Sequence, residues 1–345
     1  MVRSGVSLRE HEIVVTGASG FLGRAVMARL AGIGVPAERV HAPRSADFDL
    51  RDAARCRMMF DAALGGAPGS EGGRPALVIH CAGFVGGLGL NRMHPARMFH
   101  DNLLMALNVT EAACRAGVPR GGGGVVLVGS MTSYPAGARV PMREEDLFTG
   151  LPDAEIASYG VAKLAQVQML RAYGREHGLR GACPILSNLY GPGDNVDDPL
   201  VAHAAGALMK RFADAARDGT PEVVCWGTGA PTRDFLYVDD AAAGVVRVAE
   251  QVASGGGGRT QGGEPLVVNL ASGREVSLRE LAETLARLTG FGGRVTWDAS
   301  KGDGVARRSL DITRARDVLG WEPGVSLVEG LRRTVAWYRS RGPRE

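Results

Sequence analysis

Ten residues near the N-terminus constrain the fold more than any other part of the chain. The segment VVTGASGFLG, residues 14–23, places Gly17, Gly20 and Gly23 in GxxGxxG spacing, directly after an apolar run and at the start of a helical pattern. Glycine permits a tight strand-to-helix turn, and the helix N-terminus then offers unpaired N–H groups and a favourable dipole to a pyrophosphate. Such a turn can also exist without a ligand, so the motif alone leaves both interpretations open.

Short β-branched runs alternate with helical patterns along most of the chain. The apolar runs ALVIHCAG and GVVLVGS lie between segments with helical periodicity, a rhythm typical of βαβ units and a parallel sheet. After Pro192 the pattern becomes irregular, although SLRELAETLARLTG is amphipathic at helical spacing. The expected helices cover residues 21–31, 53–64, 98–116, 158–177, 204–218 and 326–340.

These patterns predict an α/β fold, a doubly wound parallel sheet (Rossmann) with a smaller C-terminal α/β substrate domain. The predicted larger, cofactor-binding domain comprises residues 9–185 and about 230–262, and the predicted smaller, substrate-binding domain comprises residues 186–229 and 263–345.

Composition excludes several classes of protein. The 345 residues are 45% apolar and carry a formal net charge of +3, with no block of Lys and Arg that would suggest nucleic acid or a membrane surface as partner. The N-terminus lacks the pattern of a signal peptide and no run of about 18 apolar residues occurs, so we expect a cytoplasmic protein. The five cysteines are widely spaced and never form CxxC, which predicts neither disulfides nor a metal site.

The residues after the second predicted strand favour NADPH over NADH. An NAD-specific fold usually carries an acid there, whereas VHAPRSADFDL offers Arg44 for a 2′-phosphate, with Arg24 as a weaker second candidate. A solvated surface arginine is the alternative interpretation of Arg44. Asp49 and Leu50 stand where an adenine contact is expected. The remaining predicted cofactor contacts are Gly17, Ser19, Gly20, Phe21, Leu22, Gly23 and Asn188.

The segment SYGVAK carries the predicted catalytic pair. Tyr159 and Lys163 stand at positions i and i+4, which places both side chains on one face of a helix. A neighbouring ammonium stabilises a phenolate and makes the phenol a usable proton donor near neutral pH. Such pairs also occur by chance, but here they follow a GxxGxxG motif and Ser130, which ends an apolar strand. The order of these motifs makes the prediction specific.

At this point the chain resembles the extended short-chain dehydrogenase/reductases, and among them most closely the GDP-L-fucose synthase family. Those enzymes epimerise GDP-4-keto-6-deoxymannose at C3 and C5 and then reduce C4 with NADPH. The matching segments lie along nearly the whole chain: HCAGFVGG, NLYGPGDN, LMKRF, VVCWGTGAPTRDFLYVDD, DASKGDG and SLDITRARDVLGW.

The resemblance implies roles for individual residues. Ser130, Tyr159 and Lys163 would form the catalytic triad, and Asn188 would lie near the substrate. Around the nucleotide sugar it implies Arg211, Trp226, Arg233, Lys301 and Arg308. Guanidinium groups match diphosphate oxygens and tryptophan offers a stacking face, although Trp226 could equally be a core aromatic. A homodimer is expected from the resemblance alone.

Thr132 departs from the family pattern. In fucose synthases this position is a cysteine that works with a histidine, matched here by His203, as the acid and base of epimerisation. An aliphatic hydroxyl is a far weaker acid than a thiol, so hydride transfer is expected and epimerisation is in doubt. The 4,6-dehydratases carry an Asp–Glu pair at Met131 and Thr132, which excludes that activity.

We therefore predict an NADPH-dependent 4-ketoreductase of a nucleotide-diphosphate 4-keto-6-deoxyhexose, linked to GDP or dTDP. The alternatives are a full GDP-L-fucose synthase and a nucleotide-sugar 4-epimerase, some of which carry threonine at the position of Thr132. A non-catalytic NADPH-sensing protein is a hypothesis of a different class. The complete set of Ser130, Tyr159 and Lys163 argues against it, because a protein that only binds has no need of a tuned phenol.

Overall fold

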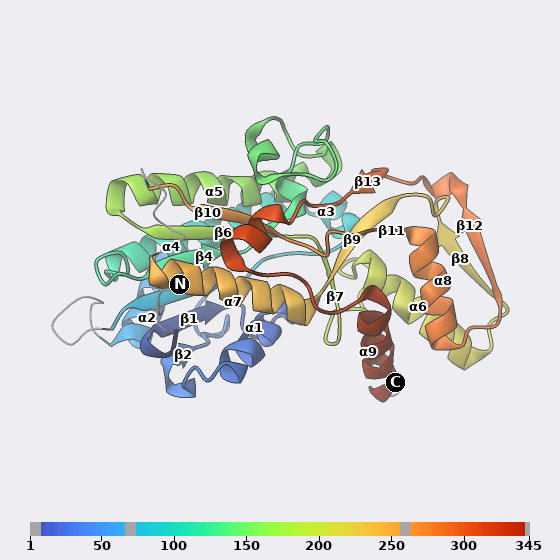
Figure 1. Ribbon diagram of the computed structural model, residues 1–345, viewed down its shortest axis with the longest axis horizontal. Coiled ribbons are helices and arrows are strands. Elements are labelled where there is room, and N and C mark those ends of the chain that lie inside the picture. Colours follow the sequence, from blue (N-terminus) through green and yellow to red (C-terminus); the bar gives the residue numbers. More distant parts are fainter. Residues whose placement is uncertain (1–7, 66–73, 256–262, 342–345) are drawn as a thin grey trace.

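The computed structural model describes residues 8–65, 74–255 and 263–341, and these form two α/β parts, each around its own apolar core (Figure 1). The first seven residues of the N-terminal stretch and the predicted domain boundary at residue 262 lie outside the described residues.

The larger part is built on a parallel sheet. Its strand order is β10-β6-β4-β3-β1-β2, and β5 pairs with β6 just beyond the end of β4. The strands are β1 (Glu12–Thr16), β2 (Val40–His41), β3 (Ala76–His80), β4 (Gly124–Leu127), β5 (Gly129–Ser130), β6 (Arg180–Leu186) and β10 (Leu266–Leu270). Every residue of β3 is buried, as expected for a strand covered on both faces.

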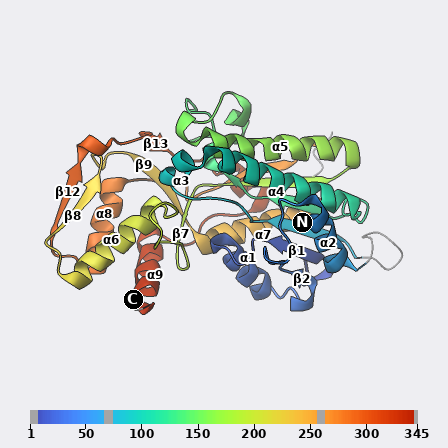
Figure 2. The ribbon, with the colours of Figure 1, turned by 180° about the vertical axis from the view of Figure 1, so that it is seen from behind.

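Helices cover both faces of this sheet. Helices α4 (Pro95–Arg115) and α5 (Ala157–His177) pack together on one face with α2 (Ala53–Leu64) beside α4, whereas α1 (Phe21–Gly32) and α7 (Val238–Ser254) pack together on the other (Figures 1 and 2). In the sheet, β2 lies on one side of β1 and β3 lies on the other, so the direction of strand addition reverses at β1. The expected doubly wound sheet is confirmed, and such a reversal opens a crevice at the carboxyl ends of the strands.

Within the described residues, the smaller part carries two short sheets together with the helices α6, α8 and α9 (Figure 2). Strand β9 pairs with β7, β11 and β13, and β8 pairs in parallel with β12. Phe212 and Phe291 meet edge to face in its core. The elements are β7 (Asn188–Tyr190), α6 (Ala204–Asp218), β8 (Glu222–Trp226), β9 (Thr232–Tyr237), β11 (Glu275–Ser277), α8 (Leu278–Thr289), β12 (Arg294–Asp298), β13 (Arg307–Arg308) and α9 (Leu327–Ser340).

Short helical turns complete the described chain. They are α3 (Leu88–Met93), the 3₁₀ turns η1 (Leu8–Glu10), η2 (Ala37–Arg39), η3 (Met131–Ser133), η4 (Glu144–Phe148), η5 (Ala154–Ile156) and η6 (Ala299–Lys301), and the π-helical turn η7 (Ala315–Leu319).

The structure differs from the predicted division of the chain at two strands and in the segment 310–321, whose buried apolar side chains belong to the core of the larger part. Strand β10 was assigned to the smaller part but pairs with β6 in the large sheet, and all five of its residues are buried. Strand β9 was assigned to the larger part but forms the centre of the smaller sheet. The reason is pairing between distant segments: an apolar run gains most where it is covered on both faces, and sequence order does not reveal that place.

Asp234, in β9, ties the two parts together. Its carboxylate is fully buried and accepts hydrogen bonds from the backbone N–H groups of Ser272 (2.8 Å) and Gly273 (3.1 Å) and from the Ser187 hydroxyl (3.2 Å). These donors come from the ends of β6 and β10 in the large sheet, so one side chain holds the sheet edge against the smaller part.

No helix among the described residues is long and apolar enough to cross a membrane. Within the same residues, no group of three or more His, Cys, Asp or Glu side chains is placed to hold a metal ion.

Candidate active site

A cleft of about 1330 Å³ lies between the two parts, at the carboxyl ends of the large sheet. Its walls come from the glycine turn, η3, α5, the N-terminal end of α6, and β13. Eighteen of the predicted site residues line it: Gly17, Ser19, Gly20, Phe21, Leu22, Gly23, Asp49, Leu50, Ser130, Thr132, Tyr159, Lys163, Asn188, His203, Trp226, Arg233, Lys301 and Arg308. Residues more than 280 positions apart in the sequence thus meet around one cavity.

The glycine turn is sterically closed to larger residues. Gly17 has a φ of +71°, and a Cβ there would lie 2.5 Å from the backbone nitrogen of Ala82. A Cβ at Gly23 would lie 2.0 Å from the carbonyl oxygen of Gly17. Gly20 is the N-cap of α1 and supplies no side-chain cap, so the first N–H groups of that helix are open to an anion. The turn therefore fits a pyrophosphate.

The end of β2 offers no acid that would bind a ribose 2′-hydroxyl. Arg44 is exposed, and its carbonyl oxygen accepts bonds from the N–H groups of Asp47 and Phe48. Asp49 lines the cleft, but its carboxylate binds Arg51 at 2.7 Å, which lowers the pKa of Asp49 to about 2. This segment fits NADP(H) better than NAD(H), because Asp49, its acid at the cleft, is engaged with Arg51.

Three predicted arginines lie outside the lining of the cleft. Arg44 is one, although its neighbours Pro43 and Ser45 line the cavity. Arg24 donates to the carbonyl oxygens of Ser19 (2.5 Å) and Gly193 (2.6 Å). Arg211 donates to the carbonyl oxygen of Val224 at 2.7 Å. The guanidinium groups of Arg24 and Arg211 bind backbone carbonyl oxygens, and neither residue lines the cavity.

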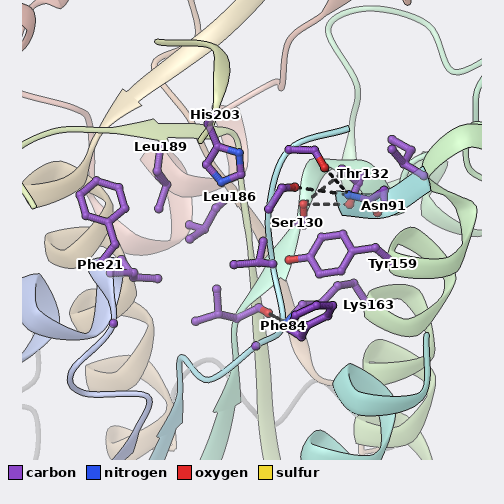
Figure 3. A pocket seen from close by; sticks show the side chains of 18 of the residues that line it. Phe21, Phe84, Asn91, Ser130, Thr132, Tyr159, Lys163, Leu186, Leu189 and His203 are labelled. Atoms are coloured by element: carbon purple, nitrogen blue, oxygen red, sulfur yellow. Dashed lines mark hydrogen bonds between the residues drawn. The ribbon is translucent and has the colours of Figure 1, made fainter. Parts of the chain in front are cut away.

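Ser130, Thr132 and Tyr159 place three hydroxyls in the cleft (Figure 3). Thr132 Oγ1 donates to Ser130 Oγ at 2.9 Å, and the backbone N–H of Thr132 donates to the same oxygen at 3.3 Å. The Ser130 hydroxyl also interacts with the Tyr159 phenol and acts to lower its pKa. Because Thr132 donates to Ser130, the proton of Ser130 is left to point toward Tyr159 or a bound carbonyl oxygen.

The electrostatics of this group favour a protonated phenol. Burial raises the pKa of Tyr159 well above its ordinary value, and the bond from Ser130 opposes that rise. Tyr159 is therefore protonated at neutral pH, and a nearby positive charge would make it a stronger proton donor.

The ammonium of Lys163, on the next turn of α5, places a positive charge near the Tyr159 ring. The residue is 4% exposed, and its ammonium donates to the carbonyl oxygen of Val128 at 2.9 Å and lies 5.8 Å from the centre of the Tyr159 ring. Burial lowers the pKa of Lys163 to about 8. The prediction that Tyr159 and Lys163 share one helix face agrees with this geometry.

Besides carboxylates such as Asp153 and Glu155, the cleft is lined by an imidazole, His203, and a thiol, Cys81, which can exchange protons. His203 is the N-cap residue of α6 and its ring enters the cleft (Figure 3), where burial lowers its pKa. Cys81 follows β3, and burial raises the pKa of its thiol to about 12. A thiol with that pKa is not a base near neutral pH, and Thr132 is engaged with Ser130.

The far end of the cleft is positively charged. Arg233 and Arg308 are directly paired in the register of β9 and β13, and burial lowers the pKa of both guanidinium groups. Trp226, at the end of β8, is 65% exposed, so it is not a core aromatic. Two adjacent, partly desolvated cations beside an exposed indole can bind a diphosphate and stack on a base. Lys301, which is exposed on η6, adds a third cation.

The sequence analysis missed Asn91, a buried residue of α3 that lines the cleft. It belongs to the segment after β3, on the far side of the chain reversal from the glycine turn. That position was a usable signal, because ligands of doubly wound sheets contact the segments that follow the two strands at the reversal.

Comparisons with known proteins agree with this geometry. The chain matches the model of the NAD dependent epimerase/dehydratase family over residues 13–269. A protein of Oryza sativa subsp. japonica named "Probable GDP-L-fucose synthase 1" is 35% identical over 327 residues, covering 95% of this chain and 92% of the relative. The "GDP-L-fucose synthase" of Escherichia coli K12 is 36% identical over 263 residues, covering 76% and 79%.

Solved structures show the same fold. The crystal structure of a GDP-L-fucose synthetase from Naegleria fowleri bound to NADP superposes with a TM-score of 0.79 at 25% identity, covering 96% of this chain and 95% of that one.

Proposed function

The chain belongs to the NAD dependent epimerase/dehydratase family of extended short-chain dehydrogenase/reductases, and we propose that it is an NADPH-dependent 4-ketoreductase of a nucleotide-diphosphate 4-keto-6-deoxyhexose. The observation that carries the proposal is the linked group of Thr132, Ser130 and Tyr159 beside Lys163 in the cleft. That group can protonate an alkoxide. Position 132 of the cleft carries a threonine, which is neither a carboxylate nor a thiol.

The proton steps follow from the positions of the side chains. Ser130 donates a hydrogen bond to the C4 carbonyl oxygen, and its own oxygen is held by Thr132. Tyr159 gives its proton to that oxygen as negative charge develops there, and the nearby Lys163 ammonium favours the phenolate that remains. NADPH, when bound on the glycine turn, supplies the hydride for C4.

The nucleotide end of the substrate belongs beside Arg233 and Arg308. Arg233 and Arg308 are register partners on neighbouring strands, and the Arg233 N–H donors not bound to the carbonyl oxygen of Thr232 can join those of Arg308 on a diphosphate. Their lowered pKa values indicate that both are partly desolvated, and a dianionic ligand would offset that cost. Trp226 then offers its exposed face to the base.

Epimerisation at C3 and C5 is not part of the proposed activity. It requires a group that removes a proton from one face of the sugar and a second group that returns it on the other. His203 can serve one face, but the hydroxyl of Thr132 is too weak an acid and already donates to Ser130. Cys81 is the remaining thiol in the cleft, and its raised pKa makes it a weaker proton donor than an ordinary cysteine.

A full GDP-L-fucose synthase is the second candidate, because relatives at 35% and 36% identity bear that name. In that case another group would have to replace the missing cysteine. A nucleotide-sugar 4-epimerase is less favoured, since those enzymes usually keep an acid after the second strand and this chain has Arg44 there.

Turnover with defined substrates tests the proposal. The oxidation of NADPH is followed with GDP-4-keto-6-deoxymannose and with dTDP-4-keto-6-deoxyglucose, and we expect one of them to be reduced. Tyr159→Phe should lower kcat by about 10²- to 10⁴-fold while NADPH still binds. Tyr173→Phe is the matched control, because Tyr173 lies on the same helix but donates to Glu111 away from the cleft. Full turnover by Tyr159→Phe would contradict the assignment.

A further inference from the structure

Arg97 lies on the first turn of α4 and lines the cleft. Its Nε donates to the carboxylate of Asp101 at 3.1 Å, and its guanidinium carbon lies 4.1 Å from the centre of the Phe84 ring. Asp101 is 6% exposed and also binds Arg51 and His100. Among the described residues, the two terminal nitrogens of Arg97 have no hydrogen-bond partner.

The two contacts of Arg97 fix the plane of its guanidinium group before any ligand binds. Asp101 binds the Nε edge, and the Phe84 ring supports one face through a cation–π contact. The end that remains open carries the two terminal nitrogens, each with two N–H donors. Arginine presents these donors as a rigid fork that matches the oxygens of a phosphate group. The side chain is therefore preorganised to bind an anion in the cleft.

The other arginines that line the cleft are engaged or lie at its far end. Arg51 binds Asp49 through Nη2 at 2.7 Å, and Arg92 is paired with Glu155. The remaining two belong to the positively charged end beside the exposed tryptophan. Within the described residues, Arg97 is thus the arginine at the cofactor end of the cleft whose terminal nitrogens are both open.

Phe84 connects this arginine to the glycine turn. It follows Ala82 by two residues, and the backbone nitrogen of Ala82 would lie 2.5 Å from a Cβ at Gly17. The backbone of Phe84 is held in place as well, because its N–H donates to Asn102 Oδ1 at 3.0 Å and its carbonyl oxygen accepts from Asn102 Nδ2 at 2.8 Å. The ring, which Figure 3 shows in the lining of the cleft, therefore holds Arg97 close to the turn that fits a pyrophosphate.

We propose that Arg97 binds a phosphate group of the bound dinucleotide and that Phe84 is the platform that holds its guanidinium group in place. The glycine turn offers backbone N–H dipoles, and a guanidinium group adds a full positive charge beside them. NADPH carries two kinds of phosphate, the diphosphate and the 2′-phosphate, and the same fork of donors fits either. The inference rests on the dinucleotide of the proposed function and is independent of the sugar.

Binding of NADPH in the absence of a sugar tests the proposal. The Kd is measured by fluorescence titration for the wild type and for Arg97→Met, which removes the charge and keeps an apolar stem against the Phe84 ring. We expect the Kd to rise about tenfold, at the low end for a charge-assisted bond because the Arg97 side chain is 54% exposed. Phe84→Leu keeps the charge and removes the ring, so the Kd should rise about threefold.

Arg115→Met is the matched control. Arg115 also lies on α4 and also pairs with a carboxylate one turn away, that of Glu111 at 2.5 Å, but it is outside the lining of the cleft. It stands about 27 Å along the helix from Arg97, and salt screens exposed charges beyond about 10 Å. The substitution removes the same charge and the same kind of ion pair, so it should leave the Kd for NADPH unchanged.

Displacement of NADPH by adenosine 2′-monophosphate separates the two phosphates, because this nucleotide carries the 2′-phosphate and no diphosphate. If Arg97→Met weakens NADPH and leaves the Kd of the monophosphate unchanged, the guanidinium group binds the diphosphate. An equal loss for both ligands places it on the 2′-phosphate. An unchanged Kd for NADPH in Arg97→Met, or an equal rise in Arg115→Met, would overturn the inference. If the wild type itself does not bind NADPH, the proposed function fails.

Discussion

Replacing Thr132 with valine removes one hydroxyl and keeps the branched shape, and we expect it to slow reduction modestly. Thr132 Oγ1 donates to Ser130 Oγ at 2.9 Å, and Ser130 is a partner of the Tyr159 phenol. Without that donor, the Ser130 hydroxyl can rotate away from the carbonyl oxygen. A neutral hydrogen bond contributes about 0.5 to 1.5 kcal/mol, so kcat should fall about 2- to 13-fold.

The assay is the single-turnover rate of NADPH oxidation, together with the Kd for NADPH from a fluorescence titration. Thr132→Ser keeps the hydroxyl and should retain a rate near that of the wild type, and NADPH should bind all three proteins equally. If Thr132→Val reduces the ketone at the wild-type rate, Thr132 does not orient Ser130. A loss of three orders of magnitude would instead mean that Thr132 exchanges protons itself.

Three further predictions follow from burial and charge. Because burial lowers the pKa of Lys163 to about 8, kcat/KM should fall as the pH rises through 8, where the ammonium that strengthens the Tyr159 acid is lost; this limb of the pH profile should be absent in Lys163→Arg. Arg308→Met should raise KM about 10- to 150-fold through loss of charge-assisted bonds to the diphosphate, whereas Arg307→Met, whose guanidinium binds Glu275 at 2.6 Å, should not; equal KM values for the two variants would refute the diphosphate site. Asp234→Ala should lower the free energy of unfolding by about 3 kcal/mol, since several buried donors lose their acceptor; an unchanged urea midpoint would show that Asp234 does not hold the two parts together.

The sequence predicted correctly those elements whose bounds are set by residues close in the chain. Helix α2 begins and ends as predicted because Asp52 accepts bonds from the N–H groups of Ala54 and Arg55, and Gly65 ends the helix in the left-handed conformation. The strand-to-helix turn was equally readable from its glycines. The place of β10 was not readable, because it depends on pairing with β6 some eighty residues earlier in the chain.

The candidate site divides in the same way. Tyr159 and Lys163 follow from helical spacing, and Ser130 follows from its place at the end of a strand. The adjacency of Arg233 and Arg308 depends on the pairing of β9 with β13, which only the folded chain reveals.

Arginine positions were the hardest to predict. Arg24 and Arg211 donate to backbone carbonyl oxygens outside the lining of the cleft. The sequence alone does not distinguish such an arginine from one that lines a binding site. Arg97 was missed for a related reason. Its terminal nitrogens are open in the cleft, which becomes evident only when its contacts with Asp101 and Phe84 are known.

The central claim, reduction at C4 without epimerisation, is tested most directly by NMR of the product formed with NADPH in D₂O from GDP-4-keto-6-deoxymannose and from dTDP-4-keto-6-deoxyglucose. We predict a sugar reduced at C4 with no deuterium at C3 or C5, because Thr132 cannot serve as the second acid. In Thr132→Cys, deuterium at these carbons would place His203 as the partner on the other face. Deuterium at C3 and C5 in the wild-type product of the GDP sugar would contradict the account and identify a full fucose synthase.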